Sequence, residues 1–260
     1  MGKRVIGIVS GKGGVGKTVT AVNLGVLLAR EGIKTLLIDS DVQNPSVGLH
    51  VGFASVHVGF QDVLGSKISL DDAVIEHSQS GLKILPASLK PSYKVQIQNF
   101  KKLLGGLDAF EYALVDSPPS VLDYVQDVIA ACDEILLVTT PDLPSVTSAN
   151  KVIAFAEKNK VHVLGIVLNR VRGKYYELPK QEVEALTNYR VLATIPENDV
   201  VPLSISMQQP LCVRFPTSAV AWKFVDLAEE ITRVPLRHAP QAHGLLRRVK
   251  ELLRRLLHFA

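Results

Sequence analysis

The residues with the clearest chemical potential lie near the N-terminus, in the run SGKGGVGKT. It contains the spacing GxxxxGK[ST] from Gly11 to Thr18, between a short β-branched segment and a segment with helical spacing. Its glycines allow the backbone to turn tightly and to point N–H groups at phosphate oxygens, and the following helix adds the positive end of its dipole. In such a loop Lys17 reaches the β- and γ-phosphates and the Thr18 hydroxyl binds Mg²⁺. The pattern predicts a site for a nucleoside triphosphate and magnesium.

Carboxylates follow two other apolar segments. Asp39 and Asp41 stand in IDSDVQNPS, and Asp116 ends the apolar part of ALVDSPPS. Taken alone, the first pair fits a solvated turn as well as it fits a site, because Asp and Asn favour turns. In an open α/β sheet, however, ligands bind at the carboxyl ends of the strands, and Asp116 falls at such an end.

The elements that must position these residues can be predicted from apolar patterning. Strands are expected at Val5–Val9, Thr35–Ile38, Leu82–Leu85, Tyr112–Val115, Ile135–Thr139, Val161–Leu168 and Val191–Ile195. Helices are expected at Lys17–Arg30, Ser120–Ala131, Ser145–Asn159, Pro179–Thr187 and Ser218–Thr232. Several strands are apolar at every position, as strands covered on both faces are. The prediction is an α/β fold with a doubly wound, mostly parallel sheet.

Composition restricts the class of protein further. The 260 residues are 47% apolar and 21% charged, which suits a globular chain with a substantial core. Two cysteines 80 positions apart, Cys132 and Cys212, exclude a disulfide scaffold and a CxxC motif. No apolar run approaches the roughly 20 residues that span a bilayer, and the start of the chain lacks the features of a signal peptide. We expect a cytoplasmic protein.

The loop GKGGVGKT, with its additional Lys12, resembles the deviant Walker A motif of the MinD/ParA family of P-loop ATPases. The resemblance extends over roughly residues 4–232 and is closest to the MinD-like septum-site-determining ATPases. It implies ATP and Mg²⁺ as ligands, a slow ATP hydrolase, and a homodimer in which Lys12 crosses to the partner's nucleotide. The nucleotide-binding residues of the loop are then Gly11, Lys12, Gly13, Gly14, Val15, Gly16, Lys17, Thr18 and Val19.

The same resemblance assigns roles to the other polar residues. Asp41 is expected to orient the attacking water, so that Lys12, Lys17 and Asp41 are the catalytic set. Asp39 and Asp116 are expected to join Thr18 around the metal. The motifs VLNRV and IPEND, which follow later strands, resemble the base site of the family, and its residues are expected to be Asn169, Arg170 and Pro196. Read without the family, these are ordinary loop residues.

Two residues depart from the family pattern. Val19 replaces the second Thr of the loop, which removes one side-chain contact to the α-phosphate. Ser120 stands where DxPxG has its last Gly, so the approach of the backbone to the γ-phosphate is altered. Both changes are consistent with slow turnover.

The last part of the chain has a composition of its own. Residues 233–243 are predicted to be a linker, and residues 244–260 hold five basic residues and one acidic residue, which equals the net charge of +4. At about 100° per residue, one face of a helix over 244–260 is apolar and the other charged, which is typical of a helix lying in a membrane surface. Its membrane-binding residues are expected to be Leu245, Leu246, Val249, Leu252, Leu253, Leu256, Leu257 and Phe259. The alternatives are docking on the body and pairing with another chain.

The sequence therefore predicts a MinD-like ATPase that dimerises with ATP, binds an anionic membrane reversibly and recruits an unidentified regulatory or cargo protein for spatial positioning. The main rival is a ParA-like partition ATPase that binds nonspecific DNA. The body of the chain balances 24 basic against 24 acidic residues, so we do not expect DNA as a partner. A slow, nucleotide-gated membrane adaptor and an iron–sulfur carrier are further alternatives, and the two scattered cysteines argue against the carrier.

Overall fold

A single eight-stranded sheet organises the computed structural model, which describes residues 2–53, 56–88, 97–119 and 123–237. The strand order is β3-β4-β2-β5-β1-β6-β7-β8. Described strands pair in parallel except for β3, which is antiparallel to β4 at one edge. The strands are β1 (Arg4–Val9), β2 (Thr35–Asp39), β3 (Ile75–His77), β4 (Leu82–Leu85), β5 (Tyr112–Asp116), β6 (Glu134–Thr139), β7 (His162–Val171) and β8 (Val191–Pro196).

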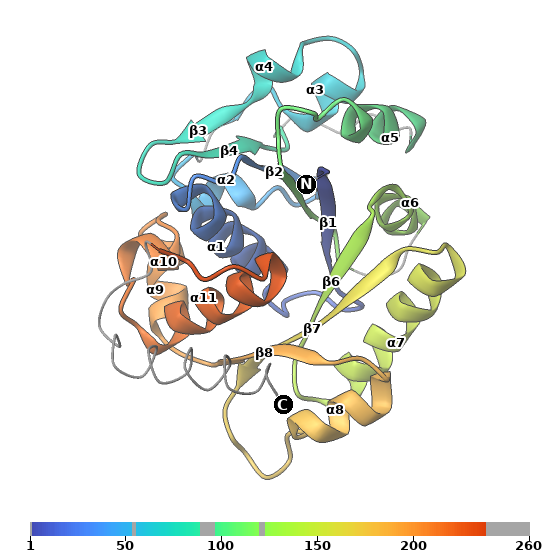
Figure 1. Cartoon of the computed structure of the whole chain (residues 1–260), viewed down its shortest axis with the longest axis vertical. Helices are drawn as coiled ribbons and strands as arrows, with labels where there is room; N and C mark the ends of the chain where they lie inside the picture. The colour runs from blue at the N-terminus through green and yellow to red at the C-terminus, as the bar shows by residue number, and fades with distance from the viewer. Residues whose placement is uncertain (1, 54–55, 89–96, 120–122, 238–260) are drawn as a thin grey trace, which may run out of the picture.

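Helices cover both faces of this sheet (Figure 1). Helices α1 (Lys17–Arg30) and α11 (Ala219–Thr232), with α9 (Val200–Ser206) and α10 (Leu211–Arg214), lie on one face. The other face carries α6 (Asp123–Ala131), α7 (Leu143–Lys158) and α8 (Lys180–Thr187), together with α3 (Phe60–Leu64), α4 (Leu70–Ala73) and α5 (Ile97–Gly105), which pack near β2 and β4. The short helix α2 (Val47–His50) packs with α1 on the first face. Within β1, Ile6 and Ile8 pack with α1 while Val9 packs with α7. This two-sided burial explains why the strands are apolar at every position.

The predicted α/β fold with a doubly wound, mostly parallel sheet is confirmed. Two helices begin at other residues than predicted, because capping residues set their first turns. Helix α7 begins at Leu143 rather than Ser145, because the Asp142 side chain accepts the Ser145 backbone N–H and ends the preceding loop. Ser218 is the N-cap of α11 and not its first residue. The start of the helix expected from Ser120 lies outside the described residues, and β3 with six short helices was not predicted.

The described chain continues past α11 as far as Arg237 and stays attached to the body. Leu236 is 2% exposed within the core, and the Arg237 backbone N–H donates to Glu31 Oε2 at 2.7 Å. The predicted amphipathic helix over 244–260 and most of the predicted linker lie outside the described residues. Where the chain is described, no helix combines the length and the apolar character needed to cross a membrane.

Candidate functional site

The loop between β1 and α1 has the backbone conformation that its glycines predict. Gly16, the N-cap of α1, has φ +96°, in the left-handed region that favours glycine. A Cβ atom at this position would lie 2.1 Å from the Asn169 side-chain nitrogen, and a Cβ at Gly11 would lie 2.2 Å from the Ser148 carbonyl oxygen. The loop is therefore folded tightly against β7 and α7, and its shape depends on residues without side chains.

The first residues of α1 meet the end of β5. Thr18 Oγ1 donates to Asp116 Oδ2 at 2.7 Å and shares a hydrogen bond with Ser46 Oγ at 3.0 Å. Asp116 Oδ1 is buried and has no hydrogen-bond partner among the described residues. Lys17 is 8% exposed. Burial lowers the pKa of its ammonium, and the negative charges of Asp116 and Asp41 offset part of this change. A cation and an oxygen ligand set thus face each other beside the loop, and the orphaned carboxylate oxygen fits a hard metal ion such as Mg²⁺.

Asp39 organises the segment that follows β2. Its carboxylate accepts the backbone N–H groups of Asp41 at 3.1 Å, Ser46 at 3.0 Å and Val47 at 3.1 Å, and its side chain is fully buried. Asp39 is also the register partner of Asp116 on the neighbouring strand. Burial raises the pKa of both carboxyls, and the charge of Asp116 raises that of Asp39 further. Through these three hydrogen bonds Asp39 stabilises the conformation of the loop after β2. Its role as a metal ligand stays a prediction.

Asp41 lies at the start of the segment that follows β2. It is 8% exposed, and Asp41 Oδ1 accepts the Asn44 backbone N–H at 3.0 Å. Burial raises the pKa of its carboxyl, while the nearby Lys17 opposes the rise. The Tyr124 hydroxyl donates to the Ser40 carbonyl at 2.9 Å and fixes the backbone just before Asp41. The Asp41 carboxylate thus lies within electrostatic reach of Lys17, and its role in orienting water stays a prediction.

The three expected base-site residues come together around one cavity of about 260 Å³. Asn169 is 7% exposed and donates to the Val15 carbonyl at 2.7 Å, which joins the end of β7 to the phosphate loop. Pro196, Val201 and Phe224 supply apolar wall, and Val19 lies in the same wall. The departure at position 19 thus adds apolar surface to this cavity.

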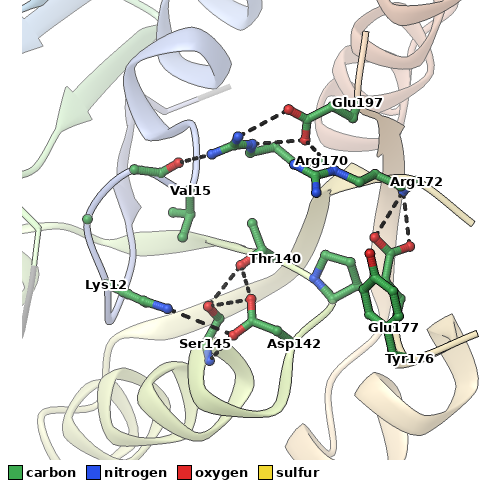
Figure 2. Close-up of a pocket in the computed structure, with 13 residues that line it drawn as sticks. Lys12, Val15, Thr140, Asp142, Ser145, Arg170, Arg172, Tyr176, Glu177 and Glu197 are labelled. Atoms are coloured by element: carbon green, nitrogen blue, oxygen red, sulfur yellow. Dashed lines mark hydrogen bonds and ion pairs between the residues drawn. The ribbon is translucent and has the colours of Figure 1, made fainter. Parts of the chain in front are cut away.

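A second cavity, of about 330 Å³, opens beside Lys12 (Figure 2). The Lys12 ammonium lies 3.9 Å from Asp142 Oδ1, and both side chains are about half exposed. On the other side Arg170, with φ +58°, donates to the Gly14 carbonyl at 3.1 Å and makes two hydrogen bonds to Glu197 at 3.0 and 3.1 Å. The Arg170–Glu197 pair therefore separates the Lys12 cavity from the base-site cavity, since both residues line both.

Sequence reasoning missed three residues of this site. Ser46 shares the Thr18 hydrogen bond, Asp142 faces Lys12, and Glu197 neutralises Arg170 and lowers its own pKa by that contact. Glu197 follows Pro196 in the quoted motif IPEND, so the rule that parallel strands end at one edge could have paired it with Arg170. Ser46 and Asp142 sit in loops with no comparable signal. Ser120 lies outside the described residues.

Residues 6–211 match the family model described as the CobQ/CobB/MinD/ParA nucleotide binding domain. The chain is 29% identical over 262 residues to the septum site-determining protein MinD of Synechocystis, covering 96% of this chain and 98% of that one.

Two solved structures share the fold. The cell division ATPase MinD of Pyrococcus furiosus is 30% identical with a TM-score of 0.83, over 90% of this chain and 99% of that one. The septum site-determining protein MinD of Pyrococcus horikoshii, solved in complex with Mg-ADP, is 28% identical with a TM-score of 0.82, over 88% and 96%.

Proposed function

The chain belongs to the CobQ/CobB/MinD/ParA family of nucleotide-binding domains, and on that premise we propose that it is a MinD-like ATPase whose ATP-bound homodimer attaches reversibly to the membrane. The observation that carries the nucleotide half of this proposal is the orphaned, buried Asp116 Oδ1 beside Thr18 and Lys17. Such an oxygen is costly to bury unless a ligand satisfies it. The Mg-ADP complex of the Pyrococcus horikoshii protein supports the same ligand class.

The residues divide the work of phosphoryl transfer among them. The loop N–H groups and Lys17 hold and neutralise the phosphates, and Thr18 with Asp116 offers oxygen ligands to Mg²⁺. When bound, Mg²⁺ neutralises charge that develops on the phosphate oxygens. Asp41 orients the water that attacks, and Asn169, Arg170 and Pro196 bind the base. Turnover is slow until a partner or membrane completes the site.

The oligomeric half rests on Lys12, which carries a half-exposed side chain at the rim of the site. Its only ionic contact among the described residues is the pair with Asp142, in a setting where exposed pairs contribute little. Lys12 can therefore leave that pair at small cost and reach the nucleotide of a second subunit. ATP closes the homodimer, and hydrolysis reopens it.

Membrane attachment is assigned to residues 244–260, after a linker over 233–243. A single amphipathic helix binds weakly and reversibly, whereas two helices carried by one dimer act at high local concentration. The nucleotide thereby controls attachment to the cytoplasmic face of the cell membrane. A regulatory or cargo protein recruited there is positioned in space, at a division site or a polar structure.

Co-sedimentation with anionic liposomes tests this proposal. The full chain, a chain that ends at His243 and the variant Lys12→Ala are each mixed with liposomes in ATP, in ADP and without nucleotide. We expect pelleting of the full chain in ATP alone, and none for the other two. Equal pelleting in ATP, in ADP and without nucleotide contradicts the proposal, and so does pelleting of the chain that lacks residues 244–260. A salt-sensitive shift of DNA by the shortened chain would instead favour the DNA-binding alternative.

A further inference from the structure

One hydroxyl group joins α6 to the segment that carries Asp41. Tyr124 lies in the first turn of α6, half-buried, and its hydroxyl donates to the Ser40 carbonyl at 2.9 Å. Its ring packs against the part of the core that contains Ile38 and Val115. Because the ring packing and the hydroxyl bond are separate contacts, substitution with phenylalanine removes the bond and keeps the packing.

The Ser40 carbonyl closes a tight turn around Asp41. It accepts the Val42 backbone N–H at 3.0 Å as well as the Tyr124 hydroxyl, so Asp41 is the central residue of a three-residue turn. Ser40 itself is fully buried, and its N–H and its hydroxyl both donate to the Asp116 carbonyl, at 3.0 and 2.8 Å. The turn is therefore anchored to β5 on one side and to α6 on the other.

The surroundings keep the Tyr124 hydroxyl protonated. Burial raises its pKa, and the negative charges of Asp41 and Asp39 raise it further. Even an unperturbed tyrosine titrates only near about pH 10, so this hydroxyl donates to Ser40 at any pH near neutrality. Titration therefore does not release the turn.

We propose that Tyr124 is a positioning residue for ATP hydrolysis, because its hydroxyl fixes, through the Ser40 carbonyl, the turn that carries Asp41. The inference rests on the proposed function, since it takes Asp41 as the residue that orients the attacking water. The groups that hold the phosphates, Lys17 and the loop N–H groups, belong to the connection from β1 to α1 and not to this turn. Loss of the hydroxyl bond therefore slows the chemical step without weakening nucleotide binding.

Steady-state ATP hydrolysis by Tyr124→Phe tests this inference. The full chain is assayed with Mg²⁺ and anionic liposomes, and binding of a fluorescent ATP derivative is titrated separately. We expect kcat to fall by about threefold to tenfold, the size of one lost hydrogen bond, while KM and nucleotide affinity stay within about twofold. The matched control is Tyr189→Phe, because the Tyr189 hydroxyl also makes a 2.9 Å hydrogen bond, to Glu157 of α7, at an exposed position. Its kinetic parameters should equal those of the parent chain.

The two readouts separate this inference from the proposed function. Unchanged kcat in Tyr124→Phe, beside an active parent chain, contradicts the positioning role alone. If kcat and nucleotide affinity fall together, the hydroxyl only supports the folded site, and the positioning role is likewise wrong. A parent chain that hydrolyses no ATP contradicts the proposed function, and the inference falls with it.

Hydrogen exchange of the ligand-free chain gives a second measurement that needs no activity. We expect faster exchange in Tyr124→Phe for peptides spanning residues 39–47, which contain the Asp41 and Val42 amides, and equal exchange for peptides from α7. Tyr189→Phe should leave residues 39–47 unchanged. Equal exchange of that segment in the parent chain and in Tyr124→Phe would show that the hydroxyl does not hold the turn, and would overturn the inference.

Discussion

Two buried carboxyls, Asp39 and Asp116, stand side by side at the ends of β2 and β5, and burial disfavours their charged forms. The raised pKa values mean that the folded chain retains protons that the unfolded chain has released. The contribution of these two carboxyls to folding stability without ligand therefore decreases as the pH rises above the ordinary carboxyl pKa. At the scale of single residues, the burial of these two carboxyls therefore lowers the stability of the ligand-free fold above the ordinary carboxyl pKa.

We expect the free energy of unfolding of the ligand-free chain to fall between about pH 6.5 and pH 8, by up to about 1.4 kcal/mol per pH unit for each retained proton. Below about pH 6.5 the lowered pKa values of His50 and His77 oppose this fall. Asp116→Asn removes one titrating group but keeps an oxygen that accepts from Thr18. Urea unfolding across this pH range should give a shallower slope for Asp116→Asn than for the parent chain. Equal slopes would contradict the raised pKa of Asp116.

A second prediction concerns the buried amide that joins β7 to the phosphate loop. Asn169→Ala leaves the Val15 carbonyl without its donor, so the free energy of unfolding should fall by about 1–3 kcal/mol even without nucleotide. The preference for ATP over GTP, measured by competition binding, should fall as well. Asn159→Ala is the control, because its amide makes a similar bond to the Phe155 carbonyl at an exposed position. A change of less than about 0.5 kcal/mol is expected there.

At the scale of elements, strands could be predicted more completely than short helices. Short runs that are apolar at every position, such as ILLVT, fit strands of a sheet covered on both faces. Strands β1, β2, β4 and β5–β8 could therefore be predicted from the sequence. Helices α2, α4 and α10 have four residues each, which is too short for a helical period to show. Strand β3 has three residues and depends on pairing with β4, which no local pattern encodes.

The site was predictable to a similar extent. Asp39 and Asp116 end parallel strands and Asn169 lies near the end of a third, so their convergence at one edge follows from strand order. Asp142 and Ser46 belong to connecting loops, whose paths depend on tertiary contacts such as the hydrogen bond from Leu178 to Pro141. Residues on strands could therefore be placed from the sequence, and residues on loops could not.

The N-cap of α7 gives a prediction at this scale. Asp142 accepts the Ser145 backbone N–H and the Thr140 and Ser145 hydroxyls. Asp142→Ala should lower the free energy of unfolding by about 0.5–2 kcal/mol, because α7 loses its cap. Asp142→Asn keeps a capping oxygen and removes the charge that faces Lys12, so its loss should be smaller. Thermal unfolding of both variants distinguishes loss of the cap from loss of the ion pair, and equal losses would contradict the capping role.

At the scale of the whole molecule, the segment after α11 packs back onto the ATPase domain through Leu236 and Arg237. A chain that ends at His243 should unfold within about 0.5 kcal/mol of the full chain, since it keeps Leu236 and Arg237. A chain that ends at Thr232 should be less stable by about 2 kcal/mol or more, because it loses the buried Leu236. Chemical unfolding of the two shortened chains checks this, with Leu236→Ala in the full chain as the matched control. If the chain ending at Thr232 is as stable as the full chain, the segment after α11 is not part of the body.

The short antiparallel strand β3 has a consequence for behaviour under crowding. Proteins gathered on a two-dimensional surface collide often, and an exposed sheet edge invites strand-to-strand polymerisation into filaments. Strand β3 offers three residues, and its central Glu76 is paired in register with Lys83 of β4. A brief, charged edge is a poor template for a growing fibril. On this side of the sheet, β3 therefore offers little edge for strand pairing between molecules.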